Sequence, residues 1–303
     1  TGMTIAEIEK HGFHAEVQVP SETGDYLIHI GQVHESQHSL EKNAEKHVNN
    51  VVHIQKNIES LLLSLKKREK LNSPVYSEAF IEDYTYLDLL SDMRDEAKKI
   101  SNGNTTLPEF IRQFRAKFKA NSSTEIALSY VYNQAVENKE DKKISAYFDD
   151  EFEGTANIYF DLGGATKAFL DNKIILRGAE RQKESDDAIA KVKKLLKASK
   201  NLAQLKIKFE NSKDDTEREM IIRVISTLTY NEMNAKSTDE YNETVKTKRE
   251  KVAVDIIGKK HVVGEDHVIV YGNAHKFKKV IDEYNEANPD TKMGLIKLSP
   301  NEE

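Results

Sequence analysis

The segment His267–Phe277, HVIVYGNAHKF, carries the pattern that decides the expected fold. An apolar run typical of a buried strand ends at Gly272, and His275 follows three residues later. The same pattern occurs in Tyr26–Ser39, YLIHIGQVHESQHS, where an apolar run reaches a glycine and His34 comes three residues after it. Glycine lets a strand turn sharply and approach a ligand without a Cβ atom. The two Gly-x-x-His segments therefore predict two strand-to-helix turns that share one site.

Further short apolar runs predict additional strands. VYSEAF at 75–80 and KIILRGAE at 173–180 are typical of buried strands, and MGLIKL at 293–298 predicts a last one. The segment PSETGD at 20–25 suits a hairpin or a longer loop within the strand-like stretch 16–31. Helical patterns occupy 39–70, 84–99, 107–119, 123–138, 185–198, 202–210, 216–228, 238–257 and 276–288.

Short strands that alternate with helices predict an α/β fold with a central, mostly parallel sheet flanked by many helices. A length of 303 residues fits one α/β domain spanning 1–303. The acidic and aromatic stretch 139–166 is expected to be a lid or a small helical or irregular insertion. Two glycines at 163–164 precede a helical pattern but lack the motif of a phosphate-binding loop.

The composition narrows the classes of function. Hydrophobic residues make up 38% of the chain and charged residues 32%, with a net charge of −6 in which both signs are mixed throughout. This balance predicts a soluble protein and offers no basic surface for nucleic acid. No apolar run approaches the roughly 18 residues of a membrane span, and the first residues lack the core of a signal peptide. A cytoplasmic location is therefore expected unless a signal segment has been removed before Thr1.

The absence of cysteine excludes disulfides, a thiol nucleophile and thiolate metal ligands. Any metal must therefore be bound by His, Asp and Glu. His34, Glu180 and His275 each follow a glycine at a strand end, and Glu78 lies near the end of its own strand. Because ligands of α/β sheets bind beyond the carboxyl ends of the strands, these side chains are expected to converge. Two imidazoles with one or two carboxylates suit a divalent metal such as Mn, Co, Zn or Fe.

Each candidate residue also has a structural interpretation. A single histidine after such a turn often only caps a helix, and it is the repetition of the turn after two core strands that favours a shared site. A buried carboxylate such as Glu78 must be compensated by an arginine or lysine, or by metal or general-base chemistry. Arg249, in KTKREKVAVDII, is either an oxyanion clamp in the same cleft or a solvated surface charge. Glu35 and His38 suit additional ligand positions and surface positions equally.

Five short segments occur in order along nearly the whole chain: GQVH at 31–34, SEAF at 77–80, LRGAERQ at 176–182, KREKVA at 248–253 and VIVYGNAHKF at 268–277. This set resembles the TraB/Tiki group, within the wider superfamily of erythromycin-esterase-like and ChaN-like proteins. That group has a Gly-x-x-His after its first core strand, a strand glutamate, a Gly-Leu-Glu turn, a helical Glu-Arg-Asn and a second Gly-x-x-His. This chain departs from it in two places, since GAE lacks the leucine and KRE lacks the asparagine.

The resemblance implies an erythromycin-esterase-like or ChaN-like fold and metal-dependent hydrolysis of a peptide or ester bond in a peptide or small-molecule substrate. His34 and His275 would bind the metal, and Glu78 would be a further ligand or the general base. Glu180 would be a second ligand or a substrate-orienting acid, and Arg249 would stabilise the oxyanion. Two other functions remain open: a non-catalytic module that binds haem or a peptide, and an interaction domain of an effector or toxin.

Overall fold

The computed structural model describes residues 5–33, 44–67, 74–82, 85–100, 162–212, 215–237 and 239–301, with a few isolated positions between 109 and 159. Its elements are α1 (Ile5–Glu9), β1 (Phe13–Val19), β2 (Tyr26–Gln32), α2 (Ala44–Lys67), β3 (Val75–Ile81), α3 (Thr85–Ile100), α7 (Gly164–Leu170), β4 (Leu176–Glu180), α8 (Gln182–Asn211), α9 (Asp215–Ser237), α10 (Asp239–Asn242), the π-helix η2 (Glu243–Thr247), α11 (Lys248–Gly258), β5 (His267–Gly272), α12 (Lys278–Ala287) and β6 (Gly294–Pro300).

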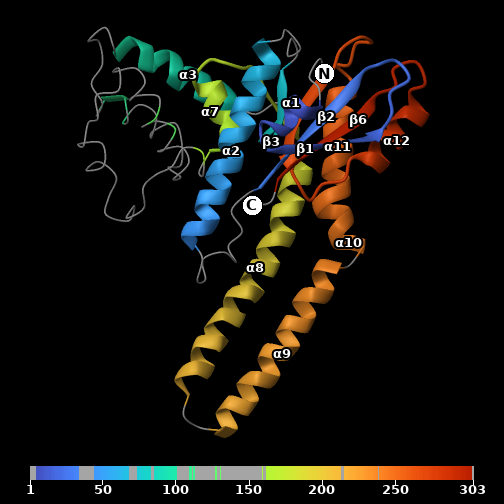
Figure 1. Cartoon of the computed structure of the whole chain (residues 1–303). Coiled ribbons are helices and arrows are strands. Elements are labelled where there is room, and N and C mark those ends of the chain that lie inside the picture. The colour runs from blue at the N-terminus through green and yellow to red at the C-terminus, as the bar shows by residue number, and fades with distance from the viewer. Residues whose placement is uncertain are drawn as a thin grey trace.

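The strands form one six-stranded sheet in the order β1-β6-β2-β5-β3-β4 (Figure 1). Five strands run parallel to one another: β6, β2, β5, β3 and β4. The sixth, β1, pairs antiparallel with β6 at one edge of the sheet. The expected α/β class with a mostly parallel sheet is therefore confirmed. No helix in the described ranges is long and apolar enough to cross a membrane.

The loop between the first two strands does not close a hairpin, because β6 lies between β1 and β2. Asp25 holds this loop in place. Its backbone oxygen accepts the Gly294 N–H at 2.8 Å, and its carboxylate accepts the Gly264 N–H at 2.9 Å. Of the two connections that the sequence left open, the longer loop is the one observed. The glycine of the first Gly-x-x-His segment, Gly31, lies inside β2 rather than at a turn.

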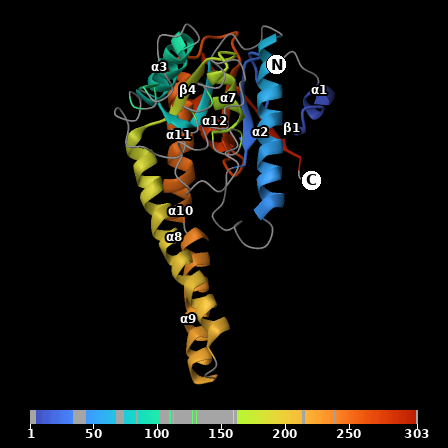
Figure 2. The same cartoon turned by 90° about the vertical axis from the view of Figure 1, so that its left-hand side faces the viewer.

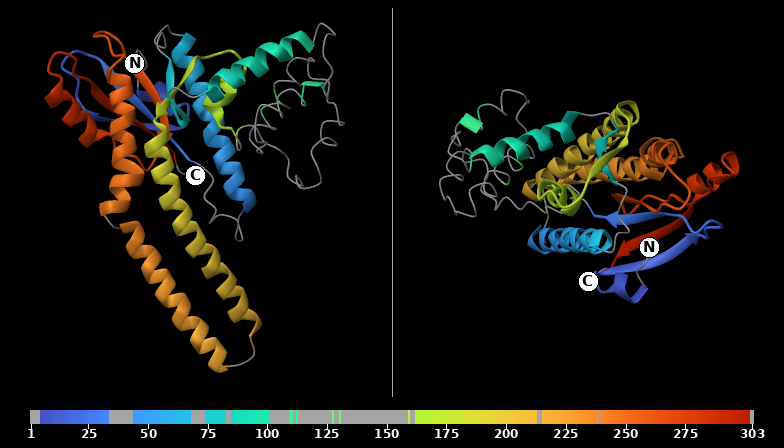
Figure 3. Two further views of the ribbon diagram at one scale, coloured as in Figure 1. Left: turned by 180° about the vertical axis from the view of Figure 1, so that it is seen from behind. Right: turned by 90° about the horizontal axis from the view of Figure 1, so that it is seen from above.

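Alternate residues of the central strands enter two separate cores, because side chains point to opposite faces along a strand. Ile28 and Ile30 of β2 join a core with the apolar residues of α2 and α7. Leu27 of β2, with Ile269 and Tyr271 of β5, joins a second core formed by α11 and α12. The sheet is therefore covered by helices on both faces, as is usual for parallel strands (Figure 3).

Helices α8 and α9 form a long antiparallel hairpin, the helical arm, which extends away from the sheet (Figures 1 and 2). The patterns at 185–198 and 202–210, expected as two helices, form the single helix α8. The arm is inserted in the chain between β4 and α11. The residues on either side of the arm are in contact. Arg249, near the start of α11, donates a hydrogen bond to Glu180, the last residue of β4.

Several expectations concern parts of the chain outside the described ranges. These are the helices expected at 107–119 and 123–138, and most of the lid or insertion expected at 139–166. The final residues of that stretch belong to α7, and they show what the two glycines at 163–164 do.

The glycine pair brings α7 close against α2. A Cβ atom at Gly164 would lie 1.9 Å from the backbone oxygen of Gln55. The Gly164 N–H donates to Gln55 Oε1 at 2.8 Å, and Gly163 precedes the helix with a φ of 81°. The first turn of α7 is therefore filled by a glutamine side chain, and the two glycines serve helix packing.

Gly164→Ala is expected to lower the free energy of unfolding by about 1–3 kcal/mol, because the methyl group must push α7 away from α2. The same change in an unhindered helix would raise the free energy of unfolding by about 1 kcal/mol. The sign of the change therefore distinguishes a crowded glycine from an unhindered one. Urea denaturation measures the difference. Gly24→Ala is a comparison for backbone strain without crowding, since Gly24 has a φ of 91° and no atom within 4 Å of its Cβ position. A stability of Gly164→Ala equal to that of the parent would contradict the contact.

Candidate functional site

Residues from segments that are far apart in the sequence lie together at the carboxyl ends of the parallel strands, which we call the carboxyl edge of the sheet. Glu78 lies in β3, Glu180 ends β4, and His275 follows β5 by three residues. Arg249 reaches the same edge from the first turn of α11. Four of the five site residues expected from the sequence are thus neighbours. The cause is the parallel sheet, whose strands end at one edge and whose loops converge there.

Arg249 connects the two strand carboxylates. Its Nη2 donates to Glu78 Oε1 at 2.7 Å, and its Nε donates to Glu180 Oε1 at 3.0 Å, with a second contact from Nη2 to the same oxygen. The Tyr271 hydroxyl also donates to Glu180 Oε1 at 3.0 Å, and the guanidinium lies over the Tyr271 ring. The side chain of Arg249 is only 14% exposed, so this is a buried ion cluster and not a solvated surface charge.

The arginine is positioned by an irregular helix. The π-helix η2 ends directly before α11, and the Val245 carbonyl within it accepts a hydrogen bond from Arg249 Nη1. Most of the arginine's donors are therefore already in use. Single π-helical turns inside longer helices are frequent at functional sites.

Gly272 allows Glu78 to approach the backbone of β5. Its N–H donates to Glu78 Oε2 at 2.6 Å. A Cβ atom at Gly272 would lie 3.2 Å from that oxygen and 3.3 Å from Cδ2 of His275. The glycine of the second Gly-x-x-His segment therefore makes room for the protein's own carboxylate and imidazole.

His275 is held by a residue that the sequence analysis did not select. Its Nδ1 lies 3.0 Å from Oε1 of Glu250, and the Lys276 backbone N–H donates to the same oxygen at 2.9 Å. Glu250 is 4% exposed and belongs to the buried face of α11 with Ala253 and Ile257. An acidic residue three and seven positions before apolar residues of a core-facing helix was the signal that could have revealed it.

The ionisation of the cluster follows from burial and pairing. Burial raises the pKa of Glu180 above its ordinary value, although Arg249 opposes the shift. Burial opposes ionisation of Glu250 as well, but hydrogen bonds from His275 and the Lys276 amide hold its pKa below the ordinary value. Burial alone would lower the pKa of His275, and its contacts with the carboxylates of Glu250 and Glu78 raise it above the ordinary value. Three carboxylates thus face one guanidinium and one imidazole, so the site is net negative when all three carboxylates are ionised.

The fit to a metal ion is partial. Within the described ranges no three His, Asp or Glu side chains are arranged to hold a metal. Two donors do face each other, since Nε2 of His275 and Oε1 of Glu78 are 3.6 Å apart. This is long for a hydrogen bond but matches two ligands of one ion, each about 2.0–2.2 Å from it. The third expected donor, His34, lies outside the described residues, as do Glu35 and His38.

The end of β2 nevertheless lies beside the cluster. Gln32, two positions before His34 in the sequence, pairs in register with Gly272. The backbone N–H of Asn273 donates to the Gln32 carbonyl at 2.9 Å. Gly31 and Gln32, which begin the first Gly-x-x-His segment, therefore lie beside the glycine of the second.

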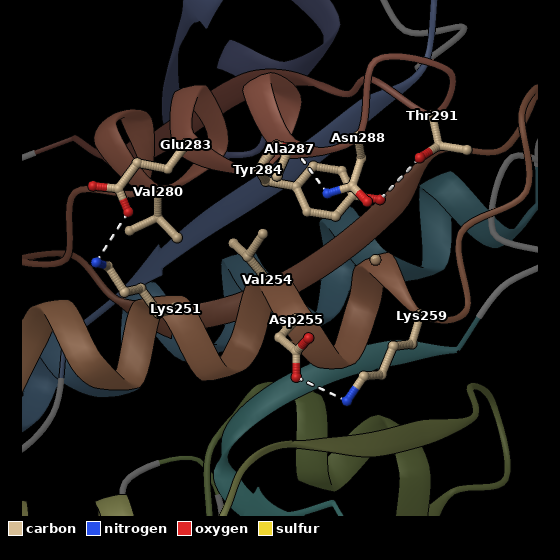
Figure 4. Close-up of a pocket in the computed structure, with 11 residues that line it drawn as sticks. Lys251, Val254, Asp255, Lys259, Val280, Glu283, Tyr284, Ala287, Asn288 and Thr291 are labelled. Carbon is tan, nitrogen blue, oxygen red and sulfur yellow. Dashed lines mark hydrogen bonds and ion pairs between the residues drawn. The ribbon is translucent and has the colours of Figure 1, made fainter.

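A groove of about 370 Å³ lies between α11 and α12, away from this cluster (Figure 4). Its charged side chains are neutralised locally, with Lys251 3.0 Å from Glu283 and Lys259 3.0 Å from Asp255. The cluster residues do not line it. Its exposed, paired charges offer little to select a ligand, so the carboxyl edge is the stronger candidate.

The fold and the site together define an α/β protein with a buried carboxylate–arginine–histidine cluster at the carboxyl edge of its parallel strands. Comparison with models of protein families, with curated proteins and with solved structures found no match to this chain.

Proposed function

We propose that the protein is a metal-dependent hydrolase of amide or ester bonds, with a TraB/Tiki-like site on an erythromycin-esterase-like or ChaN-like fold. The observation that carries the proposal is the convergence of Glu78, Glu180, Arg249 and His275 from four separate segments on one edge of the sheet. When its three carboxylates are ionised, this largely buried site carries a net negative charge, which favours a bound cation.

The residues are assigned as follows. His275 and His34 would hold a divalent metal such as Mn, Co, Zn or Fe, with Glu78 as a further ligand or as the general base. When bound, the metal would supply Lewis acidity toward the substrate carbonyl and lower the pKa of water toward about 7. Glu78 would accept the proton of the attacking water, and Glu180 would orient the substrate or complete the ligand set.

Arg249 has two roles in this proposal. Its contacts with Glu78 and Glu180 favour the ionised state of both carboxylates, which a ligand and a general base require. Nη1 donates to the Val245 carbonyl, and its second N–H would stabilise an oxyanion. The first role follows from contacts already made, and the second requires a substrate.

Elemental analysis of protein purified without chelator or added metal tests the proposal. The parent protein is expected to contain stoichiometric metal and to hydrolyse a small chromogenic ester or a fluorogenic peptide. His34→Ala and His275→Ala should lose both properties. His275→Gln is a second variant, because glutamine can still donate to the buried Glu250. The control is His14→Ala, whose histidine is exposed on β1 at the far edge of the sheet.

Unchanged metal content in both His34→Ala and His275→Ala would overturn the assignment. A Soret-band titration with haem on the same preparations separates the rival function. Haem binding by a metal-free protein without turnover would favour the non-catalytic module.

A further inference from the structure

We infer that Glu250 is a positioning residue that fixes the tautomer and the ring orientation of His275. This inference deepens the proposed function. The role of His275 as a metal ligand rests on that proposal, whereas the orientation of the ring is argued from its contacts alone. It concerns one hydrogen bond, from His275 Nδ1 to Glu250 Oε1, 3.0 Å long and between two buried residues.

The direction of that hydrogen bond follows from the other contacts of Glu250. Oε1 already accepts the Lys276 backbone N–H at 2.9 Å, and an ionised carboxylate can only accept. A lone pair on Nδ1 would face this oxygen without a proton between them. The imidazole must therefore carry its proton on Nδ1 and donate it to Glu250.

In the neutral ring the opposite nitrogen is thereby left with its lone pair. Nε2 lies 3.6 Å from Oε1 of Glu78, a longer separation than the 3.0 Å between Nδ1 and Glu250, so in the neutral ring the shorter contact keeps the proton. The ring is also fixed in direction, because it stands edge-on to the Tyr271 ring with centroids 4.6 Å apart. Carboxylates that hold the far nitrogen of a metal-binding histidine in this way orient the ring and increase its basicity.

Glu250 and Arg249 are consecutive residues at the start of α11. Arg249 holds the two carboxylates of β3 and β4, while Glu250 holds the imidazole and the backbone that follow β5. One helical turn thus positions both halves of the cluster. A shift of α11 would move the two halves together.

Nuclear magnetic resonance reads the tautomer directly, without metal or activity. Protein labelled with ¹⁵N-histidine is examined at alkaline pH, where the ring is neutral, and His275 is assigned by its loss in His275→Gln. The parent is expected to show a protonated Nδ1 and an unprotonated Nε2. Glu250→Ala should give a mixture of tautomers, and Glu250→Gln, which keeps an acceptor oxygen, should restore the parent pattern. Glu286→Ala, on the exposed side of α12, is the control.

Metal affinity supplies a second measurement. Titration with Zn²⁺ or Mn²⁺ is expected to be about 10–100-fold weaker for Glu250→Ala than for the parent and nearer to the parent for Glu250→Gln. A proton on Nε2 in the parent, or an unchanged tautomer in Glu250→Ala, would overturn the inference. The expected tautomers in a parent protein that binds no metal would instead overturn the proposed function and leave the positioning role intact.

Discussion

Arg249→Met is expected to lower the free energy of unfolding by about 3–5 kcal/mol near neutral pH. Methionine keeps much of the packing against Tyr271 but leaves Glu180, 4% exposed, and Glu78, 12% exposed, facing each other without a cation. Two buried carboxylates that contact the same guanidinium nitrogen cannot both stay ionised at low cost once it is removed, so the protein must either take up a proton or open the site. Urea denaturation followed by circular dichroism measures the loss.

Two further variants separate the charge effect from the loss of the side chain. Adding Glu180→Gln to Arg249→Met removes one of the stranded charges and should recover part of the lost stability, which a double-mutant cycle quantifies. Arg223→Met removes an arginine that is 82% exposed, and it should change the stability by no more than about 0.5 kcal/mol. A loss below about 1 kcal/mol in Arg249→Met would show that the carboxylates are compensated by something other than this guanidinium.

The second large effect is a loss of stability in mild acid. Burial lowers the pKa of His29 to about 4 and that of His267 to about 4, against the usual value of 6.5, and both side chains are 1% exposed. The folded protein therefore keeps these rings neutral, while the unfolded chain takes up protons below about pH 6.5. Each shift corresponds to about 3 kcal/mol of stability that is present above pH 6.5 and lost as the pH falls toward 4.

The surroundings of His267 show why it resists protonation. Its Nε2 is 3.0 Å from Nδ1 of His261, whose own pKa burial lowers, so the two rings cannot both be charged at low cost. Glu265, Asp266 and Asp25 favour the charged form but do not outweigh burial.

Unfolding free energies at several pH values between 4 and 7 test this prediction. His267→Gln should flatten the pH dependence in this window, whereas His14→Gln at an exposed position should leave it unchanged. His275 acts in the opposite sense, because its raised pKa adds stability below the usual value that is lost at higher pH. Equal slopes for His267→Gln and the parent would show that burial of this ring does not control acid stability.

Much of the fold could be predicted from local patterns. The strand VYSEAF, the last strand MGLIKL and the apolar face of α2 were all visible, because strand and helix periodicities are set by nearby residues. The order of the strands was not visible. The insertion of β6 between β1 and β2 depends on contacts between residues more than 260 positions apart, such as His14 and Ser299. The two predicted helices at 185–198 and 202–210 form the single helix α8, because the structure continues the helix through the residues between them.

For the candidate site, the sequence by itself determined the chemical groups: acids, an arginine and histidines placed at or near the ends of apolar runs. Only the tertiary structure decided which of them meet. It placed Arg249 between Glu78 and Glu180, and it recruited Glu250, which in the sequence is one acid among many charged helix residues. The physical reason is that periodicity reports which face of an element is buried, whereas the partner of a buried charge is chosen by strand order and helix placement, which arise from the whole chain.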